Sequence, residues 1–190
     1  MGYYSDNYNE TVKSVLGELD KALGAVEPET VEKFVQAVLE ADQVYFVGVG
    51  RVLLSLQAIC KRLAHLGIKT HYVGEITEPA ITDTDLLIVG SGSGGSLFPL
   101  GIAKKAHGIG AKIVHIVSNP NSELKDLCEF MVRIPVRTKN YLEDEIDSVQ
   151  PMTSLFEQSL LLFGDVVAKM IIDERKIDMK SLWRYHANLE

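Results

Sequence analysis

A run of small residues offers the clearest chemistry in this sequence: Gly90-Ser91-Gly92-Ser93-Gly94-Gly95-Ser96. It follows an apolar stretch typical of a strand and opens a stretch typical of a helix. Glycines let the backbone approach a ligand closely, N–H groups at a helix start attract anions, and serine hydroxyls add donors. The pattern predicts a phosphate-binding loop, with a flexible Gly/Ser connection as the alternative. It has no lysine and no GxxxxGK[ST] motif, which excludes a nucleotide-hydrolysing P-loop.

A second glycine turn, Gly48-Val49-Gly50-Arg51, follows the first apolar run. Only two glycines of the dinucleotide-binding fingerprint are in place, because Leu53 stands where the third would fall. The turn therefore gives little support to an NAD site. Arg51 supplies a cation at the carboxyl end of a strand, where it would hold an anionic substrate. A surface arginine at a helix start is the alternative.

Two further side chains are suited to moving protons. Glu157 lies at the start of a strongly apolar helix, and a carboxylate in a partly dry pocket becomes a stronger base. The alternative is a glutamate that complements the helix dipole. His186 belongs to the residue type that exchanges protons most readily near pH 7. Its alternative is an exposed residue of the tail.

These residues need a scaffold, and the hydrophobic periodicity indicates one. We expect helices over about 12–23, 31–39, 52–66, 97–109, 123–128 and 152–173, a helical tail, and strands over 44–47, 70–73, 86–89, 113–117 and 130–134. Short apolar strands that alternate with helices indicate an α/β fold with a doubly wound, mostly parallel sheet of five strands. In such sheets ligands bind beyond the carboxyl ends of the strands, where the glycine turns fall.

Length and composition limit the class of protein. The 190 residues favour a single domain, with a helix pair in 1–41, the sheet core in 42–136 and further helices in 150–190. Hydrophobic residues make up 46% and charged residues 24% of the chain, which excludes a disordered protein. The net charge of −7 argues against sequence-independent binding of nucleic acid.

The sequence shows no sign of a membrane or secretory segment. The longest apolar stretch, 160–172, contains Asp165 and Lys169 and is shorter than the roughly 20 residues of a membrane span. The first 13 residues contain no apolar core of the kind found in signal peptides. Cys60 and Cys128 lie far apart and fit a reducing cytosol, so we expect a cytoplasmic protein without membrane contact.

Metal binding and assembly are read from the remaining patterns. The five histidines form no HxH or HExxH pair, so we expect no metal site. The run 143–147 reads as a solvated acidic loop, with metal capture as the alternative. Apolar residues surround much of the helix at 152–173, which is therefore either deeply buried or packed against another subunit. We expect at least a dimer.

Together the two glycine motifs resemble those of the sugar isomerase (SIS) domain family and, within it, of the 6-phospho-3-hexuloisomerases. The similarity runs from about Val44 to the last residue. Its stretches include Phe46–Arg51, Arg62–Gly67, Val73–Glu75, Pro79–Ile81, Gly90–Gly94, Ile102–Ala106, Gly110–Ile113, Ser118–Pro120, Gln150–Pro151, Leu155–Glu157 and His186-Ala187-Asn188-Leu189-Glu190. The Ser/Gly loop marks the broad family, and the last five residues are more specific to the hexuloisomerase branch.

The resemblance implies a flavodoxin-like αβα sandwich that forms a homodimer or homotetramer and binds a phosphorylated sugar without a cofactor. The serines of the loop would bind the phosphate. The implied substrate-binding positions are the glycine turns and one carboxylate: Gly48, Gly50, Glu75, Ser91, Ser93, Gly94, Gly95 and Ser96. The implied catalytic positions are Arg51, Glu157 and His186.

Two positions depart from the family pattern. Val52 stands where the family has a serine, and Gly95 where it often has a glutamate. The first hypothesis is an isomerase that converts 3-hexulose 6-phosphate to fructose 6-phosphate by proton transfer through an enediol. The alternatives are a sugar-phosphate sensor without turnover, which Val52 and Gly95 favour, and an isomerase of a pentose or heptose phosphate.

Overall fold

The computed structural model describes residues 2–189. Within that range the elements are, in chain order, α1 (Tyr3–Gly24), α2 (Pro28–Glu40), β1 (Val44–Val47), α3 (Gly50–Ala64), β2 (Thr70–Tyr72), β3 (Leu86–Gly90), α4 (Leu97–Ile109), β4 (Lys112–Val117), β5 (Phe130–Arg133), α5 (Ser154–Glu174) and the 3-10 helix η1 (Met179–Tyr185). Glu190, the last residue of the expected terminal motif, lies outside the described residues.

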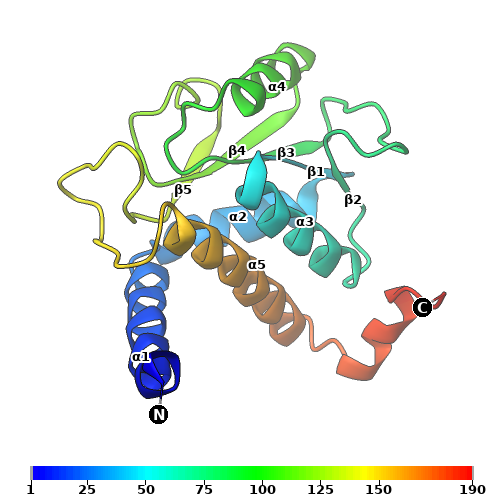
Figure 1. The fold of residues 1–190 in the computed structure, drawn as a ribbon. Helices are drawn as coiled ribbons and strands as arrows, with labels where there is room; N and C mark the ends of the chain where they lie inside the picture. Colours follow the sequence, from blue (N-terminus) through cyan, green and yellow to red (C-terminus); the bar gives the residue numbers. More distant parts are fainter. Residues whose placement is uncertain (1, 190) are drawn as a thin grey trace.

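Five parallel strands form the central sheet in the order β2-β1-β3-β4-β5 (Figure 1). Val44 of β1 pairs with Thr70 of β2 on one side and with Leu86 of β3 on the other. This is the strand order of flavodoxin-like doubly wound sheets, and it confirms the expected α/β class. The order reverses between β1 and β3, so the loops that leave these two strands border the crevice where such sheets bind ligands.

Alternate strand residues face two separate cores, as the two-residue period of a strand requires. On one face, Phe46 and Ile88 pack with α1, α2, α3 and α5. On the other face, Tyr45 and Val89 pack with α4. Figure 1 shows α4 on one side of the sheet and α2, α3 and α5 on the other. Burial from both faces explains why the strands read as continuous apolar runs.

The prediction of a short helix over 123–128 is wrong, because the structure has a series of turns there. Lys125 and Leu127 donate to carbonyls three residues earlier, at 3.0 Å each. Only Cys128 makes a bond of helical spacing, to the carbonyl of Leu124 at 3.1 Å. Six residues supply too few such bonds to offset the cost of helix nucleation, and the buried side chain of Leu124 anchors the turns instead.

Helices α3 and α5 lie side by side and touch closely. An ideal Cβ on Gly164 of α5 would lie 2.3 Å from Cγ1 and 2.7 Å from Cδ1 of Ile59 on α3. The pair Arg62–Asp165 joins the same helices further along, with Nε and Oδ1 2.9 Å apart. Because the contacts advance in the same direction along both helices, α3 and α5 run parallel and their first turns lie at the same end.

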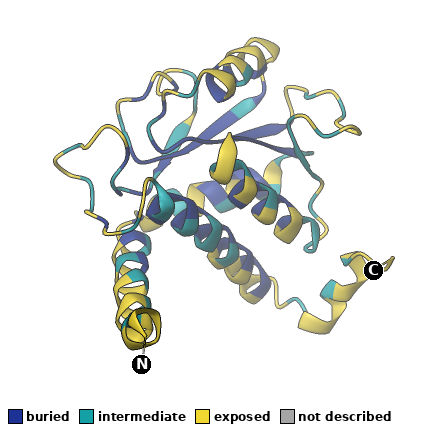
Figure 2. Ribbon diagram, viewed as in Figure 1, coloured by how far each residue is buried: buried dark blue, intermediate teal, exposed yellow. Residues whose placement is uncertain are grey.

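The apolar helix expected over 152–173 is largely buried within its own chain. Phe156, Leu160 and Val167 are fully buried against the other helices. Val166 and Met170 stay about half exposed, at 47% and 45%. The hydrophobicity of α5 is therefore explained mainly by the fold of one chain. The first half of α1 is exposed instead and carries exposed tyrosines (Figure 2).

We predict opposite effects of alanine at two helical glycines. Gly164→Ala should lower the free energy of unfolding by about 1–3 kcal/mol, because the new methyl group overpacks against Ile59. Gly17→Ala, in α1, should raise it by about 0.5–1 kcal/mol, because the new methyl group meets nothing within 4 Å. Urea unfolding of both variants measures the difference. A Gly164→Ala protein as stable as the unmutated one would contradict the close contact of α3 and α5.

Candidate active site

The serine-glycine loop, residues 90–96, leaves β3 at the crevice and leads into α4. Its centre is a tight turn in which the N–H of Gly94 donates to the carbonyl of Ser91 at 3.0 Å. Gly94 has φ +71°, a conformation that other residues rarely adopt. The hydroxyl of Ser91 donates to that of Ser96 at 3.3 Å. The sequence-predicted serines at these two positions therefore come together across the base of the loop.

The loop presents unpaired donors toward the start of α4. Within residues 2–189 the N–H groups of Ser93, Gly95 and Ser96 have no acceptor, whereas that of Gly94 is used by the turn. Ser96 precedes the first residue of α4, so the positive end of the helix dipole lies at the same place. Residues 90–96 contain no cationic side chain. The arrangement suits a small anion bound by neutral dipoles.

Arg51 and Glu157 form an ion pair between the first turns of α3 and α5. Arg51 Nε donates to Oε2 of Glu157, and Thr153 Oγ1 donates to Oε1 at 3.0 Å. The glutamate side chain is only 10% exposed, whereas that of Arg51 is 65% exposed. The hydroxyl of Ser55 on α3 donates to the backbone carbonyl of Glu157 at 2.8 Å, which locks the two helices together.

The ion pair and the serine-glycine loop are neighbours. An ideal Cβ on Gly92 would lie 3.3 Å from the ring of Phe156, the residue before Glu157. An ideal Cβ on Gly90 would lie 3.0 Å from Cγ1 of Val52, the residue after Arg51. A buried carboxylate, an exposed guanidinium and a loop with unpaired N–H groups therefore lie together at the crevice between β1 and β3.

The first glycine turn is shaped by packing as well as by position. Gly48 and Gly90 leave the space that Leu56 of α3 occupies, since an ideal Cβ on either glycine would come within 2.9 Å and 2.8 Å of its Cδ1. Val52 fills the adjoining space, which gives this departure from the family pattern a role in packing. Gly50 begins α3 with φ +57° and has open space around it.

Glu75 lies apart from the Arg51–Glu157 pair, after the edge strand β2. Its Oε1 is 2.6 Å from Nδ1 of His71, whose Nε2 is 3.2 Å from Oε1 of Gln43. The structure therefore shows Glu75 fixing a histidine. Its expected position along the site stays a prediction, because no hydrogen bond or ion pair joins Glu75 to the serine-glycine loop within residues 2–189.

The structure does not bring His186 to Glu157 within one chain. The His186 ring stacks on His65, with ring centroids 5.1 Å apart, and lies 4.9 Å from the ring of Trp183. His65 follows the last turn of α3, whereas Arg51 lies in its first turn, so about 20 Å of helix separates them. A cleft of about 530 Å³ lies beside His186, between the distal parts of α3 and α5 and the tail. Figure 1 shows the C-terminal tail at that distal end.

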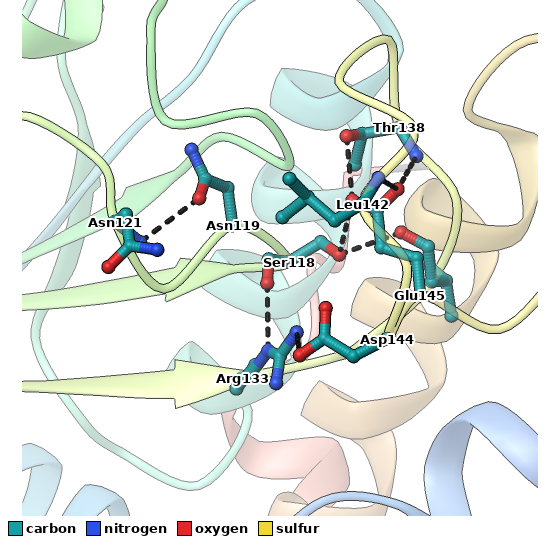
Figure 3. Close-up of polar contacts among 9 residues, drawn as sticks. Ser118, Asn119, Asn121, Arg133, Thr138, Leu142, Asp144 and Glu145 are labelled. Atoms are coloured by element: carbon teal, nitrogen blue, oxygen red, sulfur yellow. Dashed lines mark hydrogen bonds and ion pairs between the residues drawn. The ribbon is translucent and has the colours of Figure 1, made fainter.

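Glu145, expected in a solvated acidic loop, is instead the centre of a hydrogen-bond network (Figure 3). Its carboxylate accepts from the N–H groups of Thr138 and Leu142, both at 3.1 Å, and from the hydroxyls of Thr138 and Ser118, at 2.8 and 3.1 Å. A carboxylate can accept four such bonds, so this one side chain fixes the path of residues 138–145 against Ser118. The solvated interpretation is wrong for Glu145, whereas Asp144 remains 60% exposed.

Two asparagines that were not predicted from the sequence donate hydrogen bonds to the backbone of the serine-glycine loop. Asn119 Nδ2 donates to the backbone carbonyl of Ser93 at 3.1 Å, and Asn140 Nδ2 donates to the same carbonyl at 3.4 Å. Asn119 follows β4, and Asn140 belongs to the loop that Glu145 organises. Asn119 falls within a motif noted in the sequence, Ser118–Pro120, but nothing there indicates its partner 26 residues away.

The segment that leads into α5 is fixed by the N-terminal helix. Glu18 of α1 accepts from the hydroxyl of Ser148 and the N–H of Val149, both at 2.7 Å, and from Nε2 of Gln150 at 3.0 Å. Burial by itself would raise the pKa of Glu18, but these hydrogen bonds outweigh it and the pKa lies below its usual value. Helix α1 thereby fixes the chain three residues before Thr153.

Neither a metal site nor a membrane-spanning helix is found among the described residues. Within residues 2–189, no three His, Cys, Asp or Glu side chains come close enough to hold a metal ion. Among the helices described, none is long and apolar enough to cross a membrane.

Comparison with known proteins identifies the family. No family model matches the chain. Two curated relatives, both named 3-hexulose-6-phosphate isomerase, are 33% identical over 95% of this chain and 98% of the Bacillus subtilis protein, and 34% identical over 97% of this chain and 92% of the Mycobacterium gastri protein. The chain belongs to the sugar isomerase (SIS) domain family. It is an isomerase, as the names of several of its curated relatives indicate.

A solved structure of the same family matches the fold of this SIS isomerase. It is a hypothetical protein of Methanococcus jannaschii for which the function of 3-hexulose-6-phosphate isomerase is inferred. The two chains superpose with a TM-score of 0.81 at 28% identity, over 95% of this chain and 99% of the other. The resemblance noted from the glycine motifs is thus confirmed at the level of the family and the fold.

His115 gives the SIS isomerase a specific dependence on pH. Burial lowers the pKa of His115 from about 6.5 to about 4, and the nearby backbone of Ser91 opposes this effect. The unfolded chain takes up this proton near pH 6.5, whereas the folded chain resists it until about pH 4. Because the unfolded state binds more protons across that window, acidification from pH 6.5 to pH 4 lowers stability.

We predict that His115→Leu removes part of this acid sensitivity. Between pH 7 and pH 5 the unmutated protein should lose about 2 kcal/mol more unfolding free energy than the variant. His107→Asn, at an exposed position of α4, is the matched control and should keep the original slope. Urea unfolding at the two pH values measures both. Equal slopes for His115→Leu and the unmutated protein would contradict a buried, neutral His115.

Proposed function

We propose that the protein interconverts 3-hexulose 6-phosphate and fructose 6-phosphate by proton transfer through an enediol. The observation that carries the proposal is the buried Glu157 carboxylate, held by Arg51 and Thr153 beside the serine-glycine loop. Relatives that carry the name of this activity over nearly their full length support the choice of substrate.

The phosphate group would bind in the serine-glycine loop. The free N–H groups of Ser93, Gly95 and Ser96 and the hydroxyls of the loop are donors that match phosphate oxygens, and the start of α4 adds its dipole. This grip leaves the carbon chain of the sugar free to extend toward the neighbouring first turns of α3 and α5. Binding and chemistry are then carried out by different parts of the crevice.

The chemical step needs one base next to the carbonyl. In the 3-hexulose, Glu157 would remove the proton from C2 while a proton is added to the oxygen on C3, which gives the 2,3-enediol. Return of the proton to C3, with loss of the proton from the oxygen on C2, gives the 2-ketone of fructose 6-phosphate. Each carboxylate oxygen of Glu157 accepts one bond in the structure and keeps a lone pair for this proton.

Arg51 would stabilise the negative charge that develops on the enediol oxygens. Its side chain is largely exposed and is attached through a single nitrogen, so its remaining N–H groups are available to a substrate. The same ion pair keeps the Glu157 carboxylate oriented when the site is empty. Preorganised charge of this kind is a major source of rate enhancement in enzymes.

His186 would act in the site of a second copy of the chain. It lies at the far end of α3 from Glu157 in its own chain, so any role in proton transfer requires a homodimer or homotetramer in which the tail reaches the neighbouring crevice. The exposed half of α1 and the exposed tail supply apolar surface for such an assembly. In this arrangement each site takes Glu157 from one chain and His186 from another.

A non-catalytic sugar-phosphate sensor is the second candidate, favoured by one observation. Val52 packs against the sheet and adds no hydroxyl to the crevice, and Gly95 adds no carboxylate. Fewer polar groups then surround the sugar than the family pattern supplies. An isomerase of a pentose or heptose phosphate would use the same loop and the same base with a different chain length.

We predict that Glu157→Gln lowers kcat by about 10²- to 10⁴-fold, because the amide keeps the shape of the side chain but accepts no proton. The affinity for fructose 6-phosphate should change little, since the phosphate grip lies elsewhere. Glu174→Gln, at the exposed end of the same helix, is the control. In heavy water, the unmutated protein should place deuterium at C3 of fructose 6-phosphate.

The position of the deuterium separates the candidates. Label at C1 would indicate a 1,2-enediol and therefore an aldose–ketose isomerase. Binding of fructose 6-phosphate without any exchange would favour the sensor. A near-normal rate for Glu157→Gln would remove Glu157 from the role of base, and Glu75 would be tested next.

We predict that two inactive variants complement each other. Glu157→Gln and His186→Ala, each slow by itself, should regain about a quarter to a half of the normal activity when coexpressed, because mixed assemblies contain sites with both residues intact. Coexpression of the Glu157→Gln variant with the double variant, which leaves no site with both residues intact, serves as the control. Activity of the mixture no greater than the sum of the two variants would show that His186 does not complete a neighbouring site.

A further inference from the structure

His115 is an unexpected residue for its position. It lies inside β4 between apolar neighbours, and its side chain is completely buried. Its Nδ1 is 3.3 Å from the hydroxyl oxygen of Ser122, while its Nε2 has no hydrogen-bond partner within residues 2–189. A buried polar ring costs stability relative to an apolar one of similar size. The proposed proton transfer does not use it, so its place needs another explanation.

Ser122 connects His115 to the serine-glycine loop. Ser122 is 6% exposed, and its Cβ lies 2.0 Å from the position that a Cβ on Gly94 would take. Gly94 is the residue with φ +71° that makes the central turn of the loop. Contact therefore runs from the imidazole ring through Ser122 to Gly94, whose left-handed conformation makes the central turn of the loop.

The same stretch of chain holds the loop at a second point. Asn119 donates to the carbonyl of Ser93, and the N–H groups of Ser118 and Asn119 donate to the carbonyl of Gly92 at 3.0 and 3.1 Å. Residues 115–122 thus contact the loop at Gly94 and also bond the carbonyls of Gly92 and Ser93. Donors that are already held in place lose less entropy when a ligand binds, which strengthens binding.

We propose that His115 is a positioning residue of the serine-glycine loop: its ring holds Ser122, and Ser122 holds Gly94 in the conformation that leaves the N–H groups of Ser93, Gly95 and Ser96 free for an anion. The identity of that anion as a sugar phosphate rests on the proposed function. The low pKa of His115 keeps the ring neutral near pH 7, so that it orients Ser122 without placing a charge under the loop.

The test combines four variants with two measurements. His115→Leu removes the ring nitrogens, Ser122→Ala removes the hydroxyl but keeps the Cβ against Gly94, and the double variant removes both. His115→Asn keeps a polar atom near the place of Nδ1. Calorimetry gives the Kd for inorganic phosphate and for fructose 6-phosphate, and NMR hydrogen exchange gives the opening of the Gly94 N–H, with Val114 in the middle of β4 as the internal reference.

His115→Leu and Ser122→Ala should each weaken phosphate binding by about three- to tenfold, the effect of one hydrogen bond. Both should speed exchange at Gly94 without speeding it at Val114. The double variant should be no worse than either single one, because both remove the same link. His115→Asn should recover most of the affinity. Ser122→Ala keeps the test decisive if His115→Leu does not fold.

Two outcomes would overturn the proposal. One is unchanged phosphate affinity and unchanged Gly94 exchange in folded Ser122→Ala and His115→Leu. The other is exchange that rises equally at Gly94 and Val114, since that is the behaviour of a residue that only fills the core. If the unmutated protein binds neither phosphate nor fructose 6-phosphate, the proposed function fails, and the exchange at Gly94 still decides whether His115 positions the loop.

Discussion

The close approach of α3 to the sheet is the constraint on which the site depends. Leu56 and Val52 occupy space that only glycine leaves at positions 48 and 90, and Gly164 lets α5 come equally close on the other side. With any larger residue at these points α3 would lift away from both neighbours. Its first turn would then no longer meet the first turn of α5, and the pair of Arg51 and Glu157 could not form.

A second principle is the separation of support from chemistry. The residues that would act lie at the N-terminal ends of α3, α4 and α5. The residues that support them come from other segments: Glu18 from α1, Glu145 from the loop after β5, and Asn119 from the turn after β4. Each supporting side chain pairs with more than one polar group in loops that have no secondary structure of their own. Such loops keep a defined shape because their polar groups are paired.

Features that depend on local pattern were predictable from the sequence. The strand at 86–89 and the helix at 97–109 follow from apolar runs and a glycine loop, and the structure has them at those positions. Features that depend on contacts between distant segments were not. Glu145 looks like any solvated acid until the chain brings four donors to it, and Arg51 meets a carboxylate 106 residues away. The distance of His186 from Glu157 likewise follows from the length of α3 and from no motif.

The lack of any lysine or arginine in residues 90–96 would affect how an anion reaches and leaves the proposed phosphate site. The field of backbone and hydroxyl dipoles falls off more steeply with distance than that of a charge, and the nearby guanidinium of Arg51 is paired with a carboxylate, which shortens the reach of its field. The protein as a whole carries a charge of −7. We therefore expect weak long-range steering of the anion. Salt, which screens charges over about 10 Å at 0.1 M, would then have little attraction to screen, and retention of the anion would depend on short-range fit more than on ionic strength.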